Sequence, residues 1–203
     1  MNRTAKPITA LGRIPGVADQ RLVRQDLLDI GFAHDRTTGK EDWLTPPEII
    51  SALGLFDLDP CSPIGRPCDT ATEHFTLHDN GLLKAWSGRV WLNPPYGNET
   101  DKWMRRLANH GNGIALVFAR TETGTFFPWV WDYAQAILFI RGRICFYTKE
   151  GKKAGPAGAP SCLIAYGTEN AATLERCKIS GKVLVLPNAR LEPQTRETTN
   201  KKD

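Results

Sequence analysis

The chain of 203 residues carries 26 lysines and arginines against 22 aspartates and glutamates, which gives a formal net charge of +4. Hydrophobic residues make up 41% and charged residues 24%, a balance that is typical of globular domains and excludes a wholly disordered chain. No apolar run reaches the ~20 residues of a membrane helix, and residues 1–10 lack the pattern of a signal peptide. We therefore expect a soluble, cytoplasmic protein with one main domain, because domains usually hold about 100–200 residues.

The two ends of the chain have little apolar sequence to bury. Residues 1–40 mix proline, glycine and charge around one amphipathic stretch at 22–32, which predicts an N-terminal arm that can form one helix. Residues 188–203 are polar, which predicts a disordered tail. The domain itself is therefore expected over residues 41–187, between flexible termini.

Helix and strand signals follow one another from residue 45 onwards. The run Thr45-Pro46-Pro47-Glu48 predicts a helix start, with threonine as the N-cap and glutamate completing a capping box, and Gly54 predicts the helix end. Residues 55–59 alternate apolar and acidic side chains, as strands do, whereas residues 60–81 are rich in turn formers. Further along, the patterns predict a helix at 100–109 and strands at 89–92, 113–119, 134–140, 144–147, 162–166 and 183–186.

The order of these elements predicts the fold class. Strands alternate with helices in the first part of the domain, and strands dominate the second part. This order favours an α/β fold whose mixed sheet is completed by antiparallel strands. Residues 149–160 are rich in glycine and lysine and predict a basic loop inserted between two of the later strands.

The five cysteines show no metal-binding or disulfide pattern. They stand at positions 61, 68, 145, 162 and 177, without a Cys-x-x-Cys pair, and the chain has four histidines. Zinc sites usually need closely spaced cysteine and histidine ligands. The sequence therefore predicts reduced thiols, as in a cytosolic protein, and no metal site.

The run Asn93-Pro94-Pro95-Tyr96 directly follows the strand predicted at 89–92. In α/β sheets, ligands bind beyond the carboxyl ends of the strands. The side-chain oxygen of Asn93 and the carbonyl of Pro94 offer two acceptors on a proline-stiffened backbone, which suits the two hydrogens of a substrate amine. Tyr96 offers a flat ring on which a base can stack. The run is also typical of an ordinary turn that leaves a strand, so the motif alone leaves both interpretations open.

Two further segments are ambiguous when taken singly. Thr45-Pro46-Pro47 is typical of a helix start, whether or not a ligand lies beside it. Asp59-Pro60-Cys61 ends a predicted strand, where a carboxylate can bind a hydroxyl or ammonium group or cap the next element. Only the order of all three segments separates a functional from a structural interpretation.

That order resembles the S-adenosylmethionine-dependent amino-methyltransferases, and more closely the phage-type DNA N-6-adenine methyltransferases. The resemblance covers about Trp43 to Tyr166. The segments that carry it are Trp43-Leu44-Thr45-Pro46-Pro47, Phe56-Asp57-Leu58-Asp59-Pro60-Cys61, Gly81-Leu82-Leu83 with Trp86, Trp91-Leu92-Asn93-Pro94-Pro95-Tyr96, Arg120-Thr121-Glu122-Thr123 with Phe126, Gly142-Arg143-Ile144-Cys145-Phe146 and Ala159-Pro160-Ser161. The chain departs from the family pattern after the first strand, because Asp59-Pro60-Cys61 is not followed by a glycine-rich turn.

The resemblance implies a Rossmann-like methyltransferase fold and a reaction. The enzyme would transfer a methyl group from S-adenosylmethionine to the N6 of an adenine flipped out of double-stranded DNA, in phage DNA methylation or restriction–modification. By the same resemblance, the catalytic residues are Asn93, Pro94, Pro95 and Tyr96, and the residues around the methyl donor are Trp43, Thr45, Pro46, Asp59, Pro60 and Cys61. It implies action on DNA in the cytoplasm of a bacterial host, with neither a membrane nor an obligatory protein partner.

Basic residues predict where DNA phosphates bind. Residues 141–153 alone carry a net charge of +4, and Arg120 follows a buried strand at its carboxyl end. The expected DNA contacts are Arg120, Arg141, Arg143, Lys149, Lys152 and Lys153. An ordinary solvated surface segment would have the same composition.

Other substrates fit the same acceptor motif. Cytosine N4, a guanine in RNA and a glutamine side chain in protein all present an –NH₂ group. A different alternative is a catalytically inactive relative that still binds DNA. The residues that flank the motif favour adenine in DNA.

Overall fold

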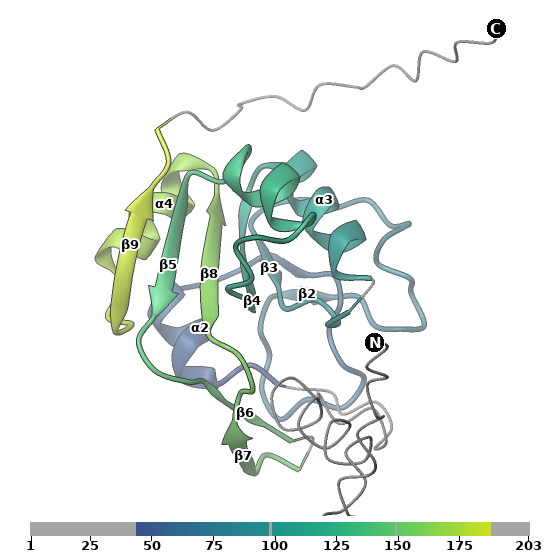
Figure 1. The fold of residues 1–203 in the computed structure, drawn as a ribbon. Helices are drawn as coiled ribbons and strands as arrows, with labels where there is room; N and C mark the ends of the chain where they lie inside the picture. Colours follow the sequence, from purple (N-terminus) through teal and green to yellow (C-terminus); the bar gives the residue numbers. More distant parts are fainter. Residues whose placement is uncertain (1–43, 98, 149, 188–203) are drawn as a thin grey trace, which may run out of the picture. The chain divides into compact units, whose positions relative to one another are not determined.

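A mixed β-sheet forms the centre of the computed structural model, which describes residues 44–97, 99–148 and 150–187 (Figure 1). Within these residues seven strands pair in one sheet. From one edge to the other they are β2 (Glu73–His74), β1 (Leu58–Asp59), β3 (Val90–Leu92), β4 (Gly113–Phe118), β8 (Ser161–Tyr166), β5 (Ala136–Ile140) and β9 (Gly181–Val185). Strands β2, β1, β3 and β4 run parallel, whereas β8 is antiparallel to β4 and β5, and β9 is antiparallel to β5. The predicted α/β fold with a mixed sheet is confirmed.

Helices pack on both faces of the sheet (Figure 1). One face is covered by α3 (Thr100–His110) and the short π-helix η1 (Phe127–Trp131), and the other face by α2 (Pro47–Leu53) and α4 (Thr168–Arg176). Strands β6 (Cys145–Tyr147) and β7 (Lys153–Pro156) form a separate antiparallel pair. A backbone bridge from Leu44 to Tyr147 connects this pair to the segment before α2.

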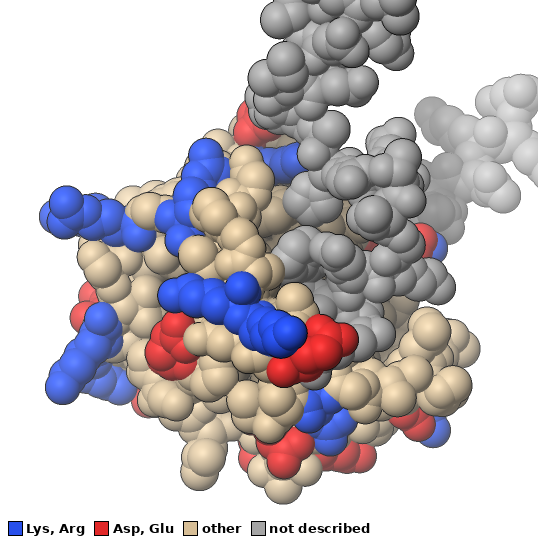
Figure 2. Space-filling view, turned by 90° about the horizontal axis from the view of Figure 1, so that it is seen from below, with Lys and Arg blue, Asp and Glu red and all other residues tan. Residues whose placement is uncertain are grey.

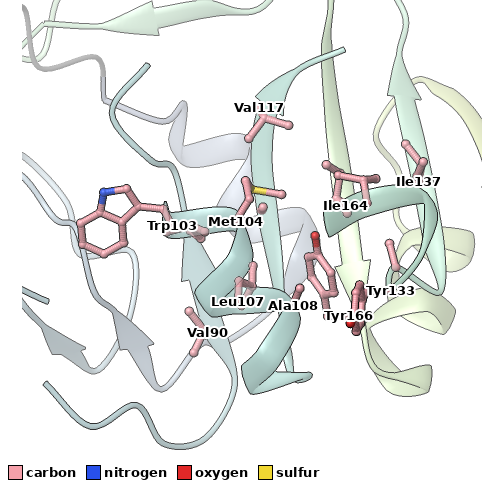
Figure 3. Close-up of a cluster of buried hydrophobic side chains, with 14 of the residues drawn as sticks. Val90, Trp103, Met104, Leu107, Ala108, Val117, Tyr133, Ile137, Ile164 and Tyr166 are labelled. Atoms are coloured by element: carbon pink, nitrogen blue, oxygen red, sulfur yellow. The ribbon is translucent and has the colours of Figure 1, made fainter. Parts of the chain in front are cut away.

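Helix α3 forms because its apolar residues recur at helical spacing. Trp103, Met104 and Leu107 are buried on its inner side, and Gly111 ends it in the left-handed conformation with φ 74°. Figure 3 shows Leu107 beside Val90 of β3 and Met104 toward Val117 of β4. Removing a buried leucine such as Leu107 typically costs about 2–5 kcal/mol, so this contact fixes the helix on the sheet.

Strands β4 and β8, near the middle of the sheet, have almost continuously apolar sequences. Every residue of β4 and of β8 is buried, because helices cover both faces of the sheet at this point. Alternate residues supply the two cores: Ala115 and Val117 of β4 face the α3 side, whereas Ile114 and Leu116 face α2 and α4.

One edge of the sheet collects the ends of several strands. Parallel strands β1, β3 and β4 end there at Asp59, Leu92 and Phe118, and the antiparallel β8 begins there at Ser161, the register partner of Phe118. Strand β5 also ends there, because Phe139 pairs with Cys162. We call this the carboxyl edge. Four of the segments singled out in the sequence, at 59–61, 93–96, 120–123 and 142–146, stand at the ends of strands that finish on it.

The predicted start of the first helix is wrong by one residue. The N-cap of α2 is Pro46, not Thr45, and no side chain caps the helix. A residue that precedes proline is pushed away from helical geometry, and Pro46 accordingly has ψ 128°. Gly54 ends the helix as predicted, with φ 86°.

Other elements differ from the prediction in extent. The strand predicted at 55–59 is reduced to β1, and Leu55, its predicted first residue, is 92% exposed. Part of the segment predicted as a basic loop forms β7, which pairs with β6 as a two-stranded ribbon. Helix α4, η1 and the two-residue β2 were not predicted.

The arm at 1–40 and the tail at 188–203 lie outside the described residues, as do Trp43 and Lys149. All five cysteines are free thiols. In the described part of the chain, no helix has both the length and the apolar character required to cross a bilayer.

Candidate active site

The carboxyl edge brings the Asp59-Pro60-Cys61 turn and the Asn93-Pro94-Pro95-Tyr96 motif together. Strands β1 and β3, which precede them, are neighbours paired at Leu58 and Val90. The two segments also touch directly, because the thiol of Cys61 donates a hydrogen bond of 3.2 Å to the main-chain oxygen of Asn93. Burial raises the pKa of Cys61 well above its usual value, and the charge of Asp59 raises it further, so the thiol keeps the proton that it donates.

Asp59 is the buried carboxylate of this turn, with 3% of its surface exposed. One carboxylate oxygen accepts the backbone N–H of Cys61 at 3.2 Å, and the other accepts the hydroxyl of Thr70. Burial raises the pKa of Asp59 to about 6, although Thr70, the Cys61 N–H and the charge of Arg66 act in the opposite direction. Asp59 is therefore ionised at neutral pH and titrates within reach of physiological conditions.

His74 holds the loop that carries Thr70. Strand β2 places His74 beside Asp59 in the sheet register. Its Nε2 accepts the backbone N–H groups of Thr70 and Ala71, each at 3.3 Å. Burial lowers the pKa of His74, which keeps this nitrogen unprotonated and able to accept. Neither Thr70 nor His74 was predicted as a site residue, because their roles depend on a two-residue strand with no sequence pattern of its own.

The acceptor motif leaves β3 as a rigid turn. Pro94 is buried, Asn93 and Tyr96 are half-buried, and Pro95 is exposed. The hydroxyl of Thr100, at the start of α3, donates to the carbonyl of Pro95 at 2.8 Å, which ties the motif to the following helix. The backbone of the motif is therefore held at its first residue by the Cys61 thiol and at its third residue by Thr100 of α3.

The ring of Tyr96 packs among aromatic side chains. It stacks on Phe118, the last residue of β4, with ring centres 4.2 Å apart and an angle of 12° between the planes. Phe146 of β6 meets it edge-on at 6.5 Å. Burial raises the pKa of Tyr96, so its phenol stays neutral. One face of the predicted stacking platform is thus occupied by Phe118, which was predicted only as part of the strand at 113–119.

The segment Thr45-Pro46, directly before α2, lies on the same side of the sheet as Tyr96. Thr45 and Pro46 are buried, and α2 packs in the core cluster that Tyr96 borders. The close backbone approach that a glycine-rich turn would normally allow is found at Gly81, where a Cβ atom would collide with the carbonyl of Pro60. The glycine that allows the close approach to Pro60 therefore comes from a segment about 20 residues further along the chain, and not from the turn itself.

Two buried hydroxyls at the carboxyl edge favour a polar ligand. Ser62 and Ser161 are 3% and 1% exposed, and neither hydroxyl has a hydrogen-bond partner among the described residues. A buried polar group without a partner costs about 1–3 kcal/mol. Ser62 directly follows the Asp59 turn, so these residues fit a polar methyl donor such as S-adenosylmethionine.

The basic residues predicted to contact DNA are exposed and fall in two places. Arg120 follows β4, with its guanidinium 5.9 Å from the ring centre of Phe118, beside the acceptor motif. The other described ones, Arg141, Arg143, Lys152 and Lys153, lie on the β5–β6 connection and the β6–β7 hairpin. Figure 2 views the molecule from the side on which Figure 1 places this hairpin, and lysine and arginine side chains spread across that face.

These observations define an α/β protein with a buried carboxylate and an Asn-Pro-Pro-Tyr turn at neighbouring strand ends. The family model for DNA N-6-adenine-methyltransferase (Dam) matches residues 33–181, which is most of the chain. The chain therefore belongs to this family of DNA methyltransferases and is of the phage-type, Dam-like kind. No protein of curated function and no solved structure shows significant similarity to it.

Proposed function

We propose that this protein transfers a methyl group from S-adenosylmethionine to the exocyclic N6 of adenine in double-stranded DNA, on a Rossmann-like methyltransferase sheet. The observation that carries the proposal is the hydrogen bond from Cys61 to the Asn93 carbonyl, which joins the Asp59 turn to the acceptor motif. A methyl transfer needs its two reactants held in line and in contact, and such alignment alone can supply a large part of the rate acceleration. Two turns at adjacent strand ends, in a chain of the Dam family, would supply that arrangement.

Asn93 and Pro94 would act on the amine. The Asn93 side-chain oxygen and the Pro94 carbonyl would accept the two hydrogens of N6. Aromatic amines are poor nucleophiles because their lone pair is delocalised into the ring. Two acceptors in fixed positions favour a more pyramidal nitrogen with a localised lone pair, an effect that is strongest in the transition state. Pro95 stiffens the backbone from which these acceptors project.

Tyr96 would stack on the flipped adenine. Flipping costs a few kcal/mol, which the pocket recovers through stacking and edge hydrogen bonds. Because Phe118 already covers one face of the Tyr96 ring, the base would use the opposite face or separate the two rings.

The donor side would be built from Trp43, Thr45, Pro46, Asp59, Pro60 and Cys61, with the buried Ser62 hydroxyl as an additional donor or acceptor. When bound, S-adenosylmethionine supplies an electrophilic methyl group on a sulfonium. Asp59 carries a negative charge at neutral pH and would bind a hydroxyl or ammonium group of the donor. Arg120 and the basic residues of the 141–153 segment would contact DNA phosphates.

Product analysis tests the proposal. The full-length protein is incubated with S-adenosylmethionine carrying a labelled methyl group and with unmethylated duplex DNA, RNA or protein, and the products are digested and separated. We expect label in N6-methyladenine from DNA. Label in N4-methylcytosine, in a guanine of RNA or in glutamine would assign the acceptor motif to another amine. Donor binding without any labelled product would identify an inactive relative.

A further inference from the structure

A hollow of about 400 Å³ opens beside α2, at the carboxyl edge but apart from the acceptor motif. Its volume lies within the ~300–1,000 Å³ range of ligand pockets. Ile49 of α2, Ile140 at the end of β5 and Ile144 before β6 give it an apolar floor. None of the residues from Asn93 to Tyr96 lines it. The hollow is therefore separate from the site that would hold the target base, although Pro46, one of the residues proposed around the methyl donor, also lines it.

Three exposed cations from distant parts of the sequence stand around this floor. They are Arg143 after β5, Lys153 of β7 and Lys178 between α4 and β9. In the described part of the chain, none of the three forms a salt bridge. Glu48 is the one carboxylate among the lining residues that the structure describes. The rim therefore has an excess of positive charge, which favours an anionic ligand.

Strand β6 connects the hollow to the acceptor site. Ile144 and Cys145 line the hollow, and the next residue of β6, Phe146, meets the ring of Tyr96 edge-on at 6.5 Å. The hollow is thus one residue of β6 away from the aromatic pair beside the acceptor motif. A ligand that enters the acceptor site and is long enough to continue past β6 would reach the three cations.

We infer that this hollow binds the sugar–phosphate backbone of the DNA duplex next to the target adenine, with Lys178 as a phosphate contact. Phosphates would lie at the basic rim, and the apolar deoxyribose would lie on the isoleucine floor. The inference rests on the proposed function in that DNA is the substrate. It extends the DNA surface to Lys178, a residue outside the basic cluster visible in the sequence.

The salt dependence of DNA binding tests the role of Lys178. The affinity of the full-length protein for a fluorescent duplex is measured by anisotropy across a series of salt concentrations, for the wild type, Lys178→Ala and Lys178→Glu. Each phosphate contact contributes about 0.9 to the slope of log affinity against log salt. We expect Lys178→Ala to reduce the slope by about one contact and to weaken binding at low salt, and Lys178→Glu to weaken it further.

Arg176→Ala is the matched control, because Arg176 is an exposed cation of the last turn of α4 that does not line the hollow. It removes the same charge from a position two residues away. An equal slope change in both alanine variants, or no change in Lys178→Ala, would overturn the inference. It would also be overturned if Lys178→Ala weakened binding of S-adenosylmethionine in the absence of DNA, because the hollow would then belong to the donor.

The same samples separate this inference from the proposed function. If the wild type forms N6-methyladenine and Lys178→Ala keeps the wild-type salt slope, only the DNA contact is refuted. If the wild type forms no N6-methyladenine but Lys178→Ala has a reduced slope of log affinity against log salt, the adenine reaction is refuted and the DNA contact is kept. Wild-type protein that does not bind the duplex would refute both.

Discussion

The Cys61 thiol makes the contact that joins the two halves of the candidate active site, and Cys61→Ala removes it. The thiol donates to the Asn93 carbonyl at 3.2 Å. A typical intramolecular hydrogen bond contributes about 0.5–1.5 kcal/mol net, and S–H is a weak donor. We therefore expect the free energy of unfolding to fall by about 0.5–1 kcal/mol. The single-turnover rate of methyl transfer should fall by about two- to fivefold, since ~1.4 kcal/mol corresponds to a tenfold change in rate.

Two further variants isolate the positioning role. Cys61→Ser keeps a hydroxyl donor and should restore most of the rate. Cys177→Ala is the matched control, because the Cys177 thiol also donates to a backbone carbonyl, that of Leu174 at 3.3 Å, but lies after α4. It should lose similar stability in urea titrations and no activity. Wild-type rates in Cys61→Ala, or equal losses in Cys61→Ala and Cys61→Ser, would refute the reasoning.

Two other residues of the site give independent predictions. The folded-state pKa of Asp59 is raised to about 6 from 3.8, so the folded protein binds more protons than the unfolded chain around and between these values. Its free energy of unfolding should therefore fall as pH rises from about 3 to about 7, by on the order of 3 kcal/mol for this group. Asp59→Asn should flatten that fall in urea titrations across the range; an unaltered fall would show that the carboxyl is not responsible. Tyr96→Ala should raise the KM for DNA roughly 5- to 150-fold, as expected from ~1–3 kcal/mol of lost stacking, whereas Tyr96→Phe should keep it near the wild-type value. A KM that stays constant in Tyr96→Ala would exclude stacking on the base.

The elements that could be predicted from sequence are those with a local signal. Helix α3 combines apolar residues at helical spacing with a glycine end, and it was predicted to within one residue. The fully buried β4 was predicted from its continuous apolar run. The position of the acceptor motif at a strand end followed from the break that two prolines impose on β3.

The parts that could not be predicted depend on contacts between distant segments. Strand β2 has two residues and exists because it pairs with β1, so neither His74 nor Thr70 had a pattern that placed it near Asp59. The stack of Phe118 on Tyr96 arises because β3 and β4 are neighbours and end at the same edge. Lys178 joins Arg143 around one hollow only after β9 has paired with β5.

The most direct test of the central claim is methyl transfer by Asn93→Ala. The amide oxygen of Asn93 is proposed to hold the amine, and loss of one pre-positioned group of this kind typically lowers kcat by about 10²–10³. Transfer of labelled methyl to duplex DNA and calorimetric binding of S-adenosylmethionine are measured on the same samples. Asn109→Ala serves as the control, since Asn109 is exposed near the end of α3. The proposal predicts that Asn93→Ala binds the donor normally and loses at least 99% of its turnover, while Asn109→Ala retains wild-type activity. Near-normal turnover in Asn93→Ala would contradict it.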